Sequence, residues 1–203
     1  MATARLIAIV LAAGRGERLG GRAKAALPLA DGRSFVAAVT QAARAGGVAR
    51  VIVVAAAPHE AATRAAAVAA GVDTIVVNDA PERGMASSFA CGLAAAAADG
   101  ADAALCWPVD HPLVRAETVA ALAAAGGPDR IVVPTYGGRG GHPTLFGASL
   151  HAACRAAADA PDGLRSLVRA DAARVVRLDG GDPGVTHDVD TLDDWARLSQ
   201  NHE

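Results

Sequence analysis

Hydrophobic residues along this chain gather in short continuous runs and not at alternating positions. The runs are rich in β-branched and aliphatic side chains and lie at residues 6–12, 50–56, 73–77, 102–109, 130–134 and 173–178. Short uninterrupted runs of this kind are typical of strands that are buried on both faces of a sheet. The pattern therefore predicts a set of interior strands.

Alanine-rich segments of helical length separate the predicted strands. They cover residues 34–46, 59–70, 84–98, 115–125 and 147–159. Strands that alternate with helices favour a mostly parallel sheet with helices on both faces. The expected fold class is α/β, a Rossmann-like three-layer sandwich with a mostly parallel central sheet, formed by residues 1–203 as a single domain.

Two glycine-rich segments interrupt this rhythm. Residues 135–146, "TYGGRGGHPTLF", are expected to form a loop or a small hairpin. Residues 179–191, "DGGDPGVTHDVDT", form a second irregular segment, which precedes a final predicted helix.

Composition and charge exclude several classes of partner. The chain is 52% hydrophobic and 20% charged, which is typical of a globular protein, and its formal net charge of -2 gives no reason to expect nucleic acid or membrane partners. Three well-separated cysteines without CxxC spacing indicate free thiols in a reducing compartment. The N-terminal apolar run lacks the features of a signal peptide, so a cytoplasmic protein is expected.

Polar residues with chemical potential follow four of the predicted strands. They lie in the opening loop 11–24, in "NDAPERGMASS" after residue 77, in "VDHP" at 109–112 and in "HDVD" at 187–190. In an open α/β sheet, ligands bind beyond the carboxyl ends of the strands. The four segments are therefore expected to meet in a single site.

The opening loop, "LAAGRGERLGGRAK", is basic and rich in glycine. It lacks the G-K-[ST] of a P-loop, and Leu19 stands where a dinucleotide fingerprint has its third glycine. The remaining interpretation is a triphosphate cradle of backbone N–H groups with Arg18 and Lys24 as counter-charges, whereas Arg15 and Arg22 are expected to be solvated. The structural alternative is a flexible basic loop.

Carboxylates at two strand ends suggest a metal site. Asp110 follows an apolar strand and is well placed to hold Mg²⁺, although an Asp that caps the following turn is an equal alternative. Asp188 and Asp190 are spaced by two, so in an extended segment they face the same way. The alternative there is a helix start, with Asp190 or Thr191 as its N-cap.

Two further segments carry polar groups, and each allows two interpretations. Ser87 and Ser88 lie in the first turn of a predicted helix, where they can recognise a polar ligand or simply cap the helix. Arg139 and His142 lie on the glycine-rich strip 135–146, which can close over a substrate or form a plain turn.

Together these motifs resemble a known family. "LAAGRGERLGGRAK" resembles the L-A-A-G-x-G-x-R-x-G…K opening of nucleotidyltransferases with a Rossmann-like sheet of the nucleotide-diphospho-sugar transferase type. "NDAPERGMASSFACGL", "VDHPLV", "PTYGGRGGHPTLF" and "HDVDTLDDW" resemble, in the same order, motifs of the MobA-like molybdenum cofactor cytidylyltransferases. The family usually has a proline where this chain has Leu192.

The resemblance implies a role for each matching residue. The nucleoside triphosphate would be held by Ala12, Ala13, Gly14, Gly16, Arg18 and Lys24, and its base would meet Ser88, with Asn78 as a weaker candidate. Mg²⁺ would be held by Asp110 and Asp190, with Asp188 as a less certain neighbour. His142 and Arg139 would face the acceptor. Lys24, Arg18 and Asp110 would be the catalytic residues.

The implied reaction is transfer of an NMP group, CMP from CTP, to a small phosphorylated acceptor such as molybdopterin, with release of pyrophosphate. A molybdoenzyme or a cofactor chaperone would be the protein partner. GTP or a sugar phosphate as substrate, and a non-catalytic protein that delivers a cofactor, are alternatives. Another is a fold relative that reduces a pigment with a nicotinamide cofactor, but "VVAAAP" lacks the acid that would bind the ribose.

Overall fold

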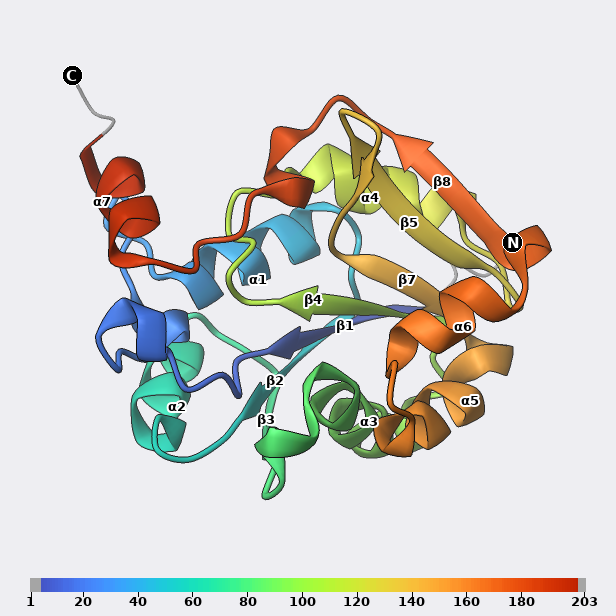
Figure 1. The fold of residues 1–203 in the computed structure, drawn as a ribbon, viewed down its shortest axis with the longest axis horizontal. Coiled ribbons are helices and arrows are strands. Elements are labelled where there is room, and N and C mark those ends of the chain that lie inside the picture. Colours follow the sequence, from blue (N-terminus) through green and yellow to red (C-terminus); the bar gives the residue numbers. More distant parts are fainter. Residues whose placement is uncertain (1–4, 201–203) are drawn as a thin grey trace.

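A single eight-stranded sheet forms the centre of the computed structural model, which describes residues 5–200 (Figure 1). Its first half consists of four parallel strands in the spatial order β3 (Thr74–Val77), β2 (Arg50–Ala55), β1 (Leu6–Leu11) and β4 (Ala103–Pro108). These strands coincide with the first four predicted runs. The expected parallel sheet is confirmed in this half of the molecule.

The second half of the sheet contains a strand that the sequence did not predict. This half of the sheet comprises β5 (Ile131–Tyr136), β6 (Arg139–Gly140), β7 (Thr144–Gly147) and β8 (Val175–Asp179). β5 and β6 form the expected hairpin, and β8 is parallel to β5. β7, however, lies antiparallel between β4 and β5. Four residues after a glycine-rich loop are too short a run to indicate a central strand.

Helices cover both faces of the sheet (Figure 1). One face packs against α1 (Phe35–Ala45), α2 (Glu60–Ala69) and α4 (Ala116–Ala125). The other packs against α3 (Met85–Ala95), α5 (His151–Ala156) and α6 (Leu164–Ala170). The three-layer sandwich is therefore confirmed.

The packing of the core explains why the strands have continuous apolar sequences. Within β1, Ala8 and Val10 belong to the cluster under α1 and α4, whereas Ile7 and Ile9 belong to the cluster under α3 and α5. All four side chains are fully buried. Because successive side chains of a strand point to opposite faces, a strand covered on both faces needs an apolar residue at every position.

One helical prediction was wrong, and one helix was missed. The segment 147–159 is not one helix, because α5 covers only His151–Ala156 between two 3₁₀ turns at Ala148–Leu150 and Ala157–Asp159. α6 was not predicted at all. Alanine-rich sequence gives a uniform helix propensity, so it does not mark where a helix changes direction.

The parallel register of β1 and β4 brings two functional segments to one edge. Leu11 pairs with Pro108, and Val109 N donates to the carbonyl of Leu11 over 3.1 Å. The glycine loop and Asp110 therefore leave the sheet side by side. The last helix, α7 (Leu192–Gln200), lies next to that loop (Figure 1). Between residues 5 and 200, no helix is long and apolar enough to cross a membrane.

Candidate active site

The opening glycine loop is a compact structure held by its own backbone. The N–H groups of Leu19 and Gly21 both donate to Gly16 O over 2.9 Å, and Leu19 is fully buried. Gly16 has a φ of 60°, and a Cβ there would lie 2.1 Å from the carbonyl oxygen of Arg22. Leu19, which breaks the dinucleotide fingerprint, thus anchors this loop in the core.

Lys24 joins the loop to two other segments through ion pairs. Its Nζ lies 2.7 Å from Asp110 Oδ2 and 2.5 Å from Asp190 Oδ1. Arg18 lies 3.0 Å from the other oxygen of Asp190. The Lys24 and Asp110 side chains are 17% and 20% exposed, whereas Arg18 is 74% exposed. The structure therefore brings together the four residues expected to bind triphosphate and metal.

These contacts shift the pKa values of the charged groups. The hydrogen bond from Lys24 lowers the pKa of Asp190, against the opposing effect of burial. Burial would lower the pKa of Lys24, but the charge of Asp110 and hydrogen bonds to both carboxylates outweigh it and raise that pKa. Both shifts favour the charged forms, so Lys24 and Asp190 are ionised near neutral pH.

Asp190 is free for this role because a neighbour caps the helix. Thr191 Oγ1 accepts from Asp194 N at 3.1 Å, while the Asp194 carboxylate accepts from Thr191 N and Thr191 Oγ1. This reciprocal arrangement resembles a capping box. Val189, buried beside it, donates its N–H to Asp110 O over 2.9 Å. The alternative in which Asp190 serves as the N-cap is wrong.

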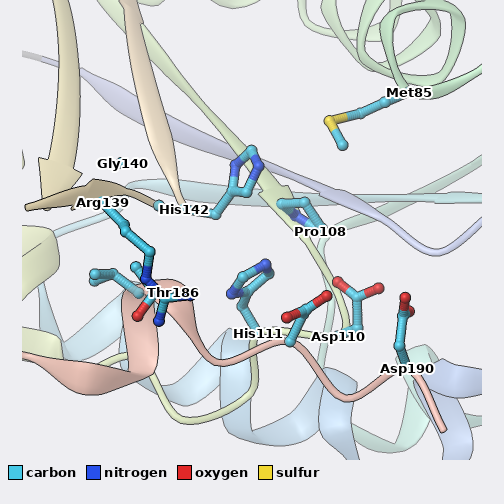
Figure 2. Close-up of a pocket in the computed structure, with 12 residues that line it drawn as sticks. Met85, Pro108, Asp110, His111, Arg139, Gly140, His142, Thr186 and Asp190 are labelled. Carbon is cyan, nitrogen blue, oxygen red and sulfur yellow. The ribbon is translucent and has the colours of Figure 1, made fainter. Parts of the chain in front are cut away.

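A first cavity of about 310 Å³ opens beside the two carboxylates. Figure 2 shows Asp110 and Asp190 next to each other at one end, His111 and His142 in the middle, and Arg139 at the opposite end. Asp188 and Met85 also line it. The strip 139–142 thus contributes to this cavity, and its role in acceptor binding stays a prediction.

The two histidines of this cavity are held neutral. Their ring centroids lie 5.2 Å apart, and the Nδ1 atoms of both are buried without a hydrogen-bond partner in the described part of the chain. Burial, helped by the neighbouring His111, lowers the pKa of His142 to about 4. Burial also lowers the pKa of His111, although the Asp110 charge opposes it. Neutral imidazoles can both donate and accept hydrogen bonds.

A second cavity of about 280 Å³ lies over the glycine loop. It is lined by Gly14, Arg15, Gly16, Glu17, Arg18, Lys24 and Asp190. No atom lies within 4 Å of a Cβ built on Gly14, so the backbone is open to a ligand there. Asp190 lines both cavities, and Lys24 contacts it from the second. The two cavities therefore meet at the ionic cluster.

Arg15 and Arg22 differ from each other. Both are exposed, and Arg15 lies 3.9 Å from Glu17. The guanidinium of Arg22, exposed as expected, also lies 5.1 Å from the ring centroid of Trp195 on α7. Trp195 Nε1 also donates to Pro28 O over 2.9 Å. Helix α7 thus braces the glycine loop, a contact that the sequence did not predict.

Asn78, Ser87 and Ser88 form a separate buried network. Asn78 Nδ2 donates to the hydroxyl oxygens of Ser87 and Ser88 over 2.9 and 3.0 Å, and Ser87 Oγ donates to Gly84 O. All three residues are buried. They do not line either of the two cavities. Base recognition by Ser88 and Asn78 stays a prediction.

Asp182 is a functional candidate that the sequence did not single out. Its carboxylate is buried and accepts from Arg115 N, Thr118 Oγ1 and Gly184 N over 2.9, 2.6 and 2.9 Å. The following residues lie against the cavity, where Val185 O accepts from His142 N over 2.8 Å. Asp182 therefore fixes the start of the segment that carries Asp188 and Asp190. Two of its three hydrogen-bond partners, Arg115 and Thr118, are 67 and 64 residues away in the sequence, and no local pattern reveals such contacts.

The donor set fits a magnesium ion. Carboxylate oxygens are the preferred protein ligands of Mg²⁺, which typically takes one or two of them and completes its shell with water and phosphate oxygens. The Lys24 ammonium already shows that one cation can lie within 2.5–2.7 Å of both Asp110 and Asp190. Among residues 5–200, no group of three or more His, Cys, Asp or Glu is arranged to hold a metal by itself.

Comparison with known proteins agrees with this geometry. The model of the MobA-like NTP transferase domain matches residues 8–175. The chain belongs to that family. The family predicted from the motifs is therefore confirmed.

Individual relatives extend the comparison. The chain is 32% identical to nicotine blue oxidoreductase from Paenarthrobacter nicotinovorans, with 94% of each chain covered. It resembles Rv0371c of Mycobacterium tuberculosis H37Rv, with 30% identity, a TM-score of 0.80, and coverage of 98% of this chain and 100% of the other. A crystal structure of that protein in complex with manganese is also similar to this chain. A nucleotidyl transferase from Methanothermobacter has 26% identity, a TM-score of 0.81 and 96% coverage of both chains.

Replacement of Asp182 by Ala should destabilise the protein by about 3 kcal/mol, because three buried donors lose their acceptor. Asp182→Asn keeps one acceptor oxygen, so its free energy of unfolding should fall by less. Urea unfolding measures both effects. Asp179→Ala, three residues earlier at the end of β8, is the matched control, since Asp179 is exposed and accepts one hydrogen bond, from Gly181 N. An Asp182→Ala protein as stable as this control would refute the anchoring role.

Acidification should destabilise the protein partly through His142. Below pH 6.5 the unfolded chain binds a proton at this residue, whereas the folded protein does so only near pH 4, so the free energy of unfolding falls over this window. A His142→Asn variant lacks that proton and should lose less stability between pH 6.5 and pH 4. Urea unfolding at several pH values measures the slope. A His142→Asn variant with the same slope as the wild-type protein would contradict the expectation.

Proposed function

We propose that this protein transfers a CMP group from CTP to a small phosphorylated acceptor of the molybdopterin type and releases pyrophosphate. The observation that carries the proposal is the meeting of two cavities at one ionic cluster, formed by Lys24, Asp110 and Asp190. Two-substrate transfer needs a donor site and an acceptor site that share a reacting centre. Family membership supports the reaction class.

The cavity over the glycine loop suits the triphosphate. Three of its lining side chains are cations, Arg15, Arg18 and Lys24, and its backbone is open at Gly14. Backbone N–H groups and cationic side chains are the usual partners of phosphate oxygens. In this proposal Ala12, Ala13, Gly14 and Gly16 provide the backbone, while Arg18 and Lys24 neutralise the phosphates.

The base of the nucleotide is assigned to the start of α3. Asn78 and Ser88 hold this helix start through a buried hydrogen-bond network. In this proposal they shape the subsite that distinguishes cytosine from other bases. Because these side chains are buried and bonded to one another, their contribution in this proposal is to fix the backbone that the base would meet.

The acceptor is assigned to the first cavity. Arg139 gives an anionic group of the acceptor a positive partner at the end opposite Asp110, and His142 and His111 offer neutral hydrogen-bonding groups between them. An acceptor phosphate oxygen would form the new bond to the α-phosphorus of CTP. The bond from that phosphorus to its bridging oxygen would break, and the electron pair would leave with pyrophosphate.

The chain's own contribution is positioning and charge. Asp110 and Asp190 would hold Mg²⁺, which supplies Lewis-acid stabilisation of phosphate charge when bound. Lys24 and Arg18 would stabilise negative charge that develops on the leaving pyrophosphate. An acceptor phosphate is a nucleophile at neutral pH, so no side chain has to remove a proton. In the cytoplasm, a molybdoenzyme or cofactor chaperone would receive the product.

A second candidate is a nicotinamide-dependent reductase, favoured by the relative named nicotine blue oxidoreductase. Against it, β2 is followed by Ala56, Ala57 and Pro58, without the acid that usually binds the ribose of NAD. The paired carboxylates Asp110 and Asp190 also have no role in hydride transfer. The transferase is therefore the preferred proposal.

A nucleotide panel tests the proposal. CTP, GTP, ATP and UTP are each supplied with Mg²⁺, with and without molybdopterin, and pyrophosphate release is measured. We expect release with CTP that depends on the acceptor, and an Asp110→Asn variant that is slower by about 100-fold or more. Asp129→Asn, before β5 and outside both cavities, is the control. Oxidation of NADH or NADPH by a pigment, without pyrophosphate release, would support the reductase instead.

A further inference from the structure

Lys24 occupies the position between the two carboxylates that would hold the metal. Its Nζ contacts one oxygen of Asp110 and one of Asp190, at 2.7 and 2.5 Å. Arg18 contacts the second oxygen of Asp190 at 3.0 Å. Two positive and two negative side chains therefore neutralise one another within the site.

Each of these four groups has a different partner under the proposed function. The cations Lys24 and Arg18 would face the triphosphate, and the carboxylates would face the metal. A metal ion and the Lys24 ammonium have the same sign of charge and need the same two oxygens. Both cannot lie there together, because like charges at hydrogen-bonding distance repel strongly.

We propose that Lys24 fills the metal position in the nucleotide-free protein, and that the triphosphate draws it away so that metal and nucleotide bind cooperatively. The inference rests on the proposed function for the identity of the two ligands. The affinity of each ligand then depends on the presence of the other, and the coupling is reciprocal.

The burial of the groups explains why either ligand alone binds weakly. A metal that arrives alone displaces Lys24, whose side chain is only 17% exposed, and leaves its ammonium without a counter-charge. A triphosphate that arrives alone takes Lys24 from two carboxylates and then faces them unshielded. A partly buried charge without a partner is costly in both cases. When both ligands bind, every charge has a partner.

The local structure allows Lys24 to exchange partners without a change of fold. Lys24 begins a short 3₁₀ turn, Lys24–Ala26, and the buried side chains of Ala25 and Leu27 anchor the backbone. The long aliphatic stem of lysine can move the ammonium while its Cα stays in place. Lys24 also lines the triphosphate cavity, so the distance to the new partner is short.

Arg18 provides a matched comparison. It carries the same charge and contacts Asp190, but it touches one carboxylate only and is 74% exposed. An exposed ion pair of this kind contributes little, because water replaces it readily. Removal of Arg18 should therefore change metal binding far less than removal of Lys24.

Titration of Mn²⁺ alone into the full, nucleotide-free chain tests the inference, with free Mn²⁺ followed by electron paramagnetic resonance. We expect Lys24→Met to bind Mn²⁺ more tightly than the wild-type protein by about tenfold, a typical size for coupling between two sites. Arg18→Met should stay within about threefold of wild type, as expected for an exposed pair. The double variant, Asp110→Asn with Lys24→Met, should lose the gain in Mn²⁺ affinity.

The reverse experiment uses tripolyphosphate with EDTA and no metal, followed by calorimetry. Asp110→Asn should bind tripolyphosphate more tightly than wild type, because Lys24 is released from one partner and a negative charge is removed. Circular dichroism and melting temperatures establish that each variant folds. For a variant that does not fold, Lys24→Gln or Asp110→Ser takes its place.

Equal Mn²⁺ affinity in wild-type and Lys24→Met proteins, weaker binding by the variant, or no binding by either would overturn the inference. These outcomes are distinct from failure of the proposed function. A protein that shows the exchange but releases no pyrophosphate with any nucleotide would retain the cation exchange and refute the transferase. A protein that releases pyrophosphate but shows no exchange would support the transferase and refute the cation exchange.

Discussion

The parallel pairing of β1 with β4 is the constraint on which the rest of the site depends. Leu11 lies opposite Pro108, so the two chains leave the sheet at the same edge. Lys24 and Asp110 are 86 residues apart in sequence, yet their side chains meet at 2.7 Å. The pairing itself needs only apolar side chains on both faces, which the two helical layers bury. The hydrophobic core thus decides where the charges can meet.

Backbone contacts then fix the loops around this edge. Val189 N donates to Asp110 O, and His142 N donates to Val185 O, so three segments are joined next to the cavity. Glycines allow their close approach, since a Cβ on Gly141 would lie 2.0 Å from Val185 O. Asp182 adds a buried carboxylate at the base of the arrangement. A site built this way is preorganised, which is what catalysis by positioning requires.

The relatives show that this fold alone does not decide a reaction. The chain belongs to the MobA-like NTP transferase domain family, yet a relative with 32% identity is named an oxidoreductase. Function is carried by the site and not by the sheet. Here the site combines a basic loop, two carboxylates and two neutral histidines. This combination matches transfer of a phosphate-bearing group better than hydride transfer.

By itself the sequence determined the class of fold and the chemistry at the strand ends. Continuous apolar runs are a local signal of strands buried on both faces, and Asp110 and the glycine loop follow such runs. The central strand β7, the broken helix at 147–159 and the bracing of Arg22 by Trp195 were decided only in the tertiary structure. So were the anchoring role of Asp182 and the position of Lys24 between two carboxylates. These features depend on contacts between residues far apart in the chain, and such contacts form only when hydrophobic packing has brought the segments together.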